Sequence, residues 1–122
     1  MARILLIDDD RDVIELLRFL LEQDGHQISE AYDGVEGVEL ATQELPDLII
    51  LDIMMPERDG YTANQQLLEN PRTRSIPIMI LTAKGQMRGL FENAPNVRCY
   101  MEKPFESKEL RSNVTDALAK TH

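Results

Sequence analysis

Two hydrophobic patterns alternate along the chain. Short, mainly apolar runs are separated by longer stretches in which apolar residues recur every three or four positions. The short runs predict strands, and the longer spacing predicts amphipathic helices. Strands are expected at Arg3–Ile7, Gln27–Ala31, Leu48–Leu51, Ile78–Leu81 and Val97–Met101. Strands that alternate with helices indicate βαβ units and therefore an α/β fold with a parallel sheet.

The helices are predicted from their apolar faces and their stop signals. The first helix ends at Gly25 and the second at Pro46, and the third follows Gly60 and is stopped by Asn70-Pro71. A last helix begins near Glu106 or Ser107. The expected core faces are Val13, Ile14, Leu17, Leu20 and Leu21 in the first helix, Val35, Val38, Ala41 and Leu45 in the second, and Leu110, Val114 and Leu118 in the last.

The segment between the last two predicted strands is the weakest part of the pattern. Gly85, Gly89 and Pro95 lie where a further helix belongs, and each of them opposes helix formation. We therefore expect that helix to be short or irregular. A segment of this kind is also the part of the chain that we expect to select partners.

Composition limits the class of protein. A chain of 122 residues with 43% hydrophobic and 29% charged residues fits one globular domain spanning residues 1–122. The net charge of −9 argues against direct nucleic-acid binding, and no apolar run is long enough to cross a membrane. Residues 1–4 lead directly into a strand without a signal-peptide core, and Cys99 is the single cysteine. A cytoplasmic location is expected, with Cys99 acting as a small core residue.

Charged residues follow three of the predicted strands. Asp8, Asp9 and Asp10 come after the first strand, Asp52 after the third, and Lys103 after the fifth. In an open parallel sheet, ligands bind beyond the carboxyl ends of the strands. Acids and a lysine gathered at that edge are the composition of a metal and phosphoryl site.

These motifs give the chain a resemblance to the receiver domains of two-component response regulators. The residues that carry it are Asp8-Asp9, Asp52 with Met55-Pro56 and Asp59-Gly60, Thr82-Ala83, and Lys103-Pro104-Phe105. Each motif alone is weak, but all of them occur in order and at strand ends. The resemblance implies a doubly wound, flavodoxin-like sheet of five parallel strands in the order 2-1-3-4-5, with helices on both faces.

The resemblance also implies a reaction. Asp52 would accept a phosphoryl group from a histidine kinase or a histidine phosphotransfer protein, since a carboxylate can act as the nucleophile. Mg²⁺ (or Mn²⁺) would neutralise the phosphoryl oxygens, because it prefers hard oxygen ligands. Asp9 and Asp52 would bind the ion directly, Asp8 through water, and Met54 through its backbone carbonyl.

Three further roles follow from the same resemblance. Lys103 would pair with the phosphoryl oxygens, Thr82 would hydrogen-bond the phosphoryl group, and Tyr100 would be the switch aromatic. The chain would then be a signalling switch that catalyses only its own phosphorylation and dephosphorylation. It would act on a downstream protein effector or on an output domain that is missing here, either as a stand-alone receiver or as part of a longer regulator.

Simpler interpretations exist for the same residues. Acids cap helix N-termini, and Asp10 is expected to do so. Capping alone does not account for three acids. Two carboxylates ~4 Å apart repel by roughly 4 kcal/mol at an effective dielectric constant of ~20, so a bound cation is the simpler explanation. Thr82 is otherwise an ordinary strand residue, and Tyr100 a half-buried one.

Three other functions compete with the switch. A haloacid-dehalogenase-type hydrolase also uses a strand-end aspartate, but needs an acid where Met54 stands. A flavin-binding module needs a phosphate-cradling loop after the first strand, where this chain is acidic. A degenerate receiver would only make protein contacts, and measured phosphorylation distinguishes it from the switch.

Overall fold

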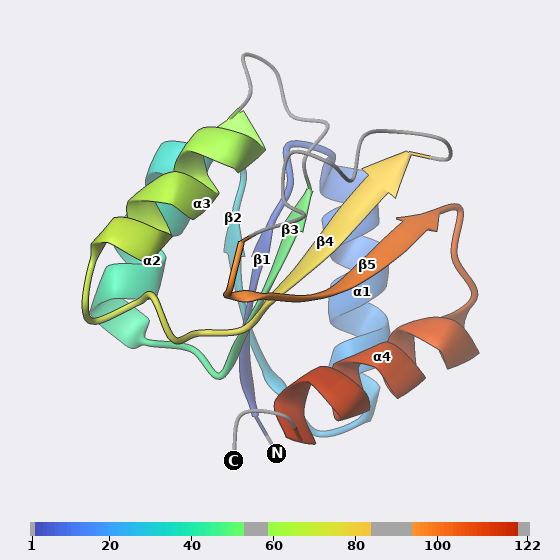
Figure 1. Cartoon of the computed structure of the whole chain (residues 1–122). Helices are drawn as coiled ribbons and strands as arrows, with labels where there is room; N and C mark the ends of the chain where they lie inside the picture. Colours follow the sequence, from blue (N-terminus) through green and yellow to red (C-terminus); the bar gives the residue numbers. More distant parts are fainter. Residues whose placement is uncertain (1, 53–58, 84–93, 120–122) are drawn as a thin grey trace.

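Five parallel strands form the centre of the molecule. The computed structural model describes residues 2–52, 59–83 and 94–119. Its strands are β1 (Arg3–Ile7), β2 (Gln27–Ala31), β3 (Leu48–Asp52), β4 (Ile78–Ala83) and β5 (Val97–Lys103). They lie in the order β2-β1-β3-β4-β5, and every neighbouring pair is parallel (Figure 1). This arrangement confirms the predicted fold class and strand order.

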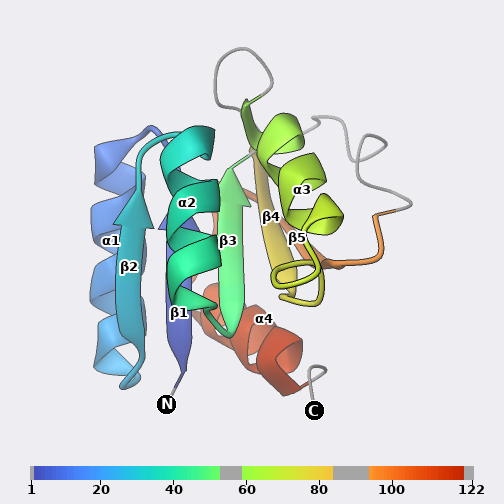
Figure 2. The ribbon, with the colours of Figure 1, turned by 90° about the vertical axis from the view of Figure 1, so that its left-hand side faces the viewer.

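Helices cover both faces of the sheet (Figure 2). The helices are α1 (Arg11–Gln23), α2 (Gly34–Glu44), α3 (Asp59–Glu69) and α4 (Ser107–Ala119). Buried residues of α1 and α4 pack on one face, and those of α2 and α3 pack on the other. Side chains of β1, β3 and β4 alternate between these two cores, so all three strands are apolar along most of their length.

Three strands run further toward the carboxyl edge than the apolar pattern predicts. β3 includes Asp52, β4 continues through Ala83, and β5 continues through Lys103. Backbone pairing maintains these extensions, because Asp52 pairs with Leu81 and Ala83 with Lys103. Hydrophobicity does not reveal them, since the added residues are mostly polar. Asp52, Thr82 and Lys103 therefore project from backbone that is paired within the sheet and not from loops.

The expected core face of the first helix is correct. Ile14, Leu17 and Leu21 are buried, and Val13 and Leu20 pack against them. Asp10 caps this helix by accepting hydrogen bonds from the backbone N–H groups of Asp12 and Val13, as predicted.

The expected core face of the second helix is partly wrong. Val35 is 67% exposed and Leu45 is 41% exposed. Ala41 is buried and Val38 packs against the core, as predicted, but the other buried residues of α2 are Gly34 and Gly37. A Cβ atom at Gly37 would lie 2.5 Å from Cδ1 of Ile7 in β1. The helix lies too close to β1 for a large side chain to fit at this point.

Two sequence predictions lie outside the described residues. They are the irregular helix expected after β4 and the backbone contact of Met54. The last helix begins at Ser107, one of the two positions predicted for its start.

Candidate functional site

The carboxyl end of β1 supplies two aspartates in different surroundings. Asp8 follows Ile7 directly and is 1% exposed, whereas Asp9 is exposed. The backbone N–H of Asp8 donates to the carbonyl of Ala31 in β2 at 3.1 Å. Its side-chain Oδ1 accepts from the N–H of Asp10 at 2.9 Å. Backbone and side chain together fix the direction of the Asp8 carboxylate.

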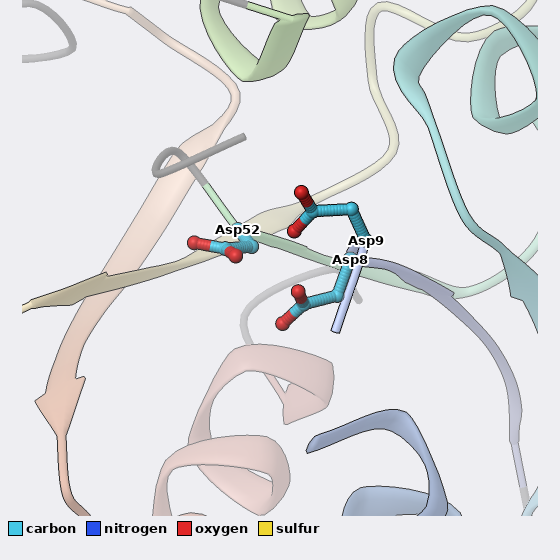
Figure 3. A group of neighbouring side chains, drawn as sticks. All are labelled: Asp8, Asp9 and Asp52. Carbon is cyan, nitrogen blue, oxygen red and sulfur yellow. The ribbon is translucent and has the colours of Figure 1, made fainter. Parts of the chain in front are cut away.

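Asp52 lies opposite these residues, at the end of β3. Its exposure is only 2%. One carboxylate oxygen from each of Asp8, Asp9 and Asp52 lies within 4.8 Å of the other two, and Figure 3 shows the three carboxylates gathered at the edge of the sheet. The strand-end argument predicted this grouping, and the structure brings the three together.

Lys103 connects the two buried aspartates. Its Nζ lies 3.4 Å from Oδ2 of Asp8 and 3.3 Å from Oδ2 of Asp52. Burial lowers the pKa of Lys103, but the charges of Asp52 and Asp8 outweigh burial and raise that pKa above its usual value. Lys103 is therefore a permanent cation in the middle of the acidic group. No spacing or motif in the chain predicts the contact of this lysine with Asp8.

Burial makes the charge of Asp8 unfavourable despite the lysine. Burial, followed by hydrogen bonding to Asp52, raises the pKa of Asp8 from 3.8 to about 7. Part of the negative charge is thus unfavourable at neutral pH. A bound divalent cation would relieve this, and three carboxylates provide the hard oxygen ligands that Mg²⁺ takes. The donor set therefore fits this ion.

Thr82 and Tyr100 lie in neighbouring strands. Thr82 in β4 is 1% exposed and lies next to Glu102 of β5 in the ladder. Tyr100 in β5 is half-buried and packs against the core on the side of α2 and α3. Thr82 lies two residues beyond Ile80, the ladder partner of Tyr100, so both side chains share that face of the sheet. This placement is compatible with the predicted switch pair.

An apolar groove that the sequence pattern did not predict lies beside Lys103. Val13 and Leu16 of α1 line it from one side, and Pro104 and Phe105 from the other. Leu16 and Phe19 of α1 are 49% and 59% exposed. Two large apolar residues on the outer side of an amphipathic helix were the signal for an extra surface.

A family model described as "Response regulator receiver domain" matches residues 4–115. This chain belongs to the response regulator receiver family. The family membership favours the switch over a dehalogenase-type hydrolase or a flavin-binding module.

Relatives differ in how much of their length the receiver occupies. The DNA-binding dual master transcriptional regulator RpaA of Synechocystis sp. is 40% identical over 122 residues, which cover 99% of this chain but 51% of RpaA. Protein PilH of Pseudomonas aeruginosa is 38% identical, over 98% of this chain and 99% of PilH. The chain thus spans about half the length of RpaA and nearly the whole of PilH.

Solved structures agree with the fold. A putative response regulator from Chloroflexus aurantiacus has a TM-score of 0.88 and 34% identity, over 97% of this chain and 98% of that one. The receiver domain of a sensor histidine kinase from Pseudomonas aeruginosa has a TM-score of 0.85 and 28% identity, with the same coverage. That structure has a magnesium ion coordinated in its active-site cleft. Among the described residues of the present chain, no helix is both long and apolar enough to span a membrane.

Proposed function

We propose that this receiver accepts a phosphoryl group on Asp52 from a histidine kinase or a histidine phosphotransfer protein and then changes its binding to a partner. The observation that carries the proposal is the surroundings of Asp52. It is 2% exposed, it ends a strand, and it lies 3.3 Å from a lysine beside two further aspartates. A solvated turn residue needs no such neighbours.

The reaction depends mainly on positioning the reacting groups and on neutralising their charge, because phosphoryl transfer leaves the protein little other covalent work. An oxygen of Asp52 forms a bond to phosphorus while the bond from phosphorus to the donor's histidine nitrogen breaks. The electron pair of that bond stays on the imidazole. Strand β3 holds the nucleophile, and Lys103 is close enough to exchange its contact with Asp52 for one with a phosphoryl oxygen.

Magnesium is proposed as the resident ion. Asp9 and Asp52 would hold it directly, Asp8 through water, and Met54 through its backbone carbonyl. When bound, the ion supplies positive charge to the phosphoryl oxygens. The hydrogen bond from the backbone N–H of Asp10 orients the carboxylate of Asp8.

Thr82 and Tyr100 are proposed to report phosphorylation. A hydroxyl group at Thr82 can donate a hydrogen bond to a phosphoryl oxygen. If Thr82 moves toward Asp52, the space beside Tyr100 on the same face changes. Tyr100 is half-buried, so a second position for its ring exposes different surface to a partner.

For the downstream partner, we propose only its general class. The effector is either a separate protein or an output domain joined to the receiver. We propose that this chain acts in the cytoplasm and does not itself bind nucleic acid, because its net charge is −9.

Phosphorylation with acetyl phosphate and Mg²⁺ tests the proposal. Mass spectrometry should show one base-labile phosphoryl group, located on Asp52. Asp52→Asn should abolish it, whereas Asp116→Asn, an exposed change on α4, should not. Labelling of Asp52→Asn at the wild-type rate, or no labelling of the wild type, would reject the phosphoacceptor and favour a degenerate receiver.

A further inference from the structure

The groove beside Lys103 has the size and composition of a small ligand site. It has a volume of about 390 Å³, and the described residues that line it are Val13, Leu16, Lys103, Pro104 and Phe105. This volume lies near the lower end of the range for ligand pockets, which is roughly 300–1,000 Å³. These lining residues come from α1, from the end of β5 and from the loop that joins β5 to α4.

Lys103 belongs to both the groove and the acidic site. Its side chain helps to line the groove, while its Nζ contacts Asp8 and Asp52. Among the described lining residues it carries the only charge, and the other four are apolar. A ligand suited to this surface has an anionic group at Lys103 and an apolar chain along Leu16 and Phe105.

We infer that the groove binds the hydrocarbon chain of small acyl phosphates, so that longer-chain acyl phosphates phosphorylate Asp52 faster than acetyl phosphate does. The inference rests on the proposed function and adds a substrate class to it. In the reaction, a carboxylate oxygen of Asp52 bonds to phosphorus. The bond from phosphorus to the bridging oxygen breaks, and the acyl carboxylate leaves with the electron pair. No proton has to move.

The expected effect follows from the area that the chain buries. A fully buried methylene contributes about 0.8 kcal/mol, or about fourfold in binding, and a methylene in an open groove about half of that energy. We expect about a twofold gain in rate per methylene. Hexanoyl phosphate has four more methylenes than acetyl phosphate, so it should react roughly fifteenfold faster at equal subsaturating concentration.

The test compares acetyl, butyryl and hexanoyl phosphate by mass spectrometry of the full chain with Mg²⁺. Leu16→Ala removes one wall of the groove at a position that is 49% exposed, so the core stays intact. It should reduce the hexanoyl-to-acetyl rate ratio to about twofold or less. Phe19→Ala is the matched control, because Phe19 is also exposed on α1 but does not line the groove. It should leave the ratio unchanged.

A competition experiment provides an independent measurement. Hexylphosphonate, which cannot transfer its phosphorus and has five more methylenes than methylphosphonate, should inhibit labelling by acetyl phosphate at roughly thirtyfold lower concentration than methylphosphonate. Equal rates for all three acyl phosphates, or an equal loss of the ratio in Phe19→Ala, would overturn the inference and leave Asp52 as the phosphoacceptor. Failure of every acyl phosphate to label Asp52 would instead reject the proposed function, and the inference with it.

Discussion

The last residues of β1 and the aspartate that follows them are equally buried but have opposite effects on stability. Leu5, Leu6 and Ile7 in the sheet interior are 0% exposed, and Asp8, the next residue along the chain, is 1% exposed. Burial of the aliphatic side chains stabilises the fold. Burial of a carboxylate beside another carboxylate opposes it, as the raised pKa of Asp8 shows. The interior therefore supports an edge that is unfavourable until it binds a cation.

The largest effect should come from the interior. Leu6 is in the core between the sheet and helices α1 and α4, and Leu6→Ala should lower the free energy of unfolding by about 3 kcal/mol. Leu16→Ala, at an exposed position of α1, should cost less than about 1 kcal/mol. Urea denaturation measures both. A similar cost for the two variants would show that the interior does not dominate stability.

Mg²⁺ should stabilise the protein by nearly as much as Leu6→Ala destabilises it. At about 100 times its dissociation constant, it should add about 2.7 kcal/mol to the free energy of unfolding. Asp9→Ala should remove most of this gain and change the metal-free protein little, because Asp9 is exposed. Thermal melts with and without Mg²⁺ test this. A melting temperature that rises in Asp9→Ala as much as in wild type would exclude Asp9 as a ligand.

Asp8→Asn should stabilise the metal-free protein, unlike any change in the interior. Folding raises the pKa of Asp8 from 3.8 to about 7, so the folded state holds the proton more tightly. The contribution of Asp8 to stability is thus greatest below pH 4 and is lost as the pH rises to about 7. Asparagine stays neutral and can keep the hydrogen bond from Asp10.

The stabilisation by Asp8→Asn should therefore grow with pH. We expect an increase on the order of 2 kcal/mol between pH 5 and pH 8 without Mg²⁺. Denaturation at the two pH values in a chelating buffer measures it. A gain independent of pH, or a destabilised variant, would show that Lys103 already compensates the Asp8 charge in full.

The smallest effects should distinguish the two sides of α2. Gly37→Ala should cost about 1 kcal/mol despite the better helix propensity of alanine, because its Cβ would meet the buried Ile7. Val35→Ala should change stability by less than about 0.5 kcal/mol, since Val35 is 67% exposed. If Val35→Ala cost more than Gly37→Ala, the sequence-based core face of this helix would be the correct one.

Periodicity predicted the elements whose contacts are made by large apolar side chains. The strands and α1 are of this kind, with Ile14, Leu17 and Leu21 spaced along one buried face. It failed at α2, because glycine and alanine permit close packing but add little to an apolar pattern. It also ended β4 and β5 too early, since backbone hydrogen bonds extend those strands through polar residues.

The site was predictable as far as strand topology alone determines it. Carboxyl ends of parallel strands meet, so Asp8 and Asp52 had to be neighbours once the sheet was predicted. The contact between Lys103 and Asp8 depends on the path of one flexible side chain, which no spacing rule describes. The groove depends on how α1 lies against the loop after β5, which is a tertiary distance and not a local pattern.

The ion pair between Lys103 and Asp8 has a consequence for the protein while it is being synthesised. The two residues are 95 positions apart, and Lys103 ends the strand at one edge of the sheet. A nascent chain that has exposed only β1 to β4 already contains Asp8 and Asp52 but lacks Lys103, the cation that lies between them in the folded protein. During that interval the acidic edge has no internal counter-charge from β5. A divalent cation bound there, as proposed for Mg²⁺, would supply the missing counter-charge and favour folding before any signal arrives.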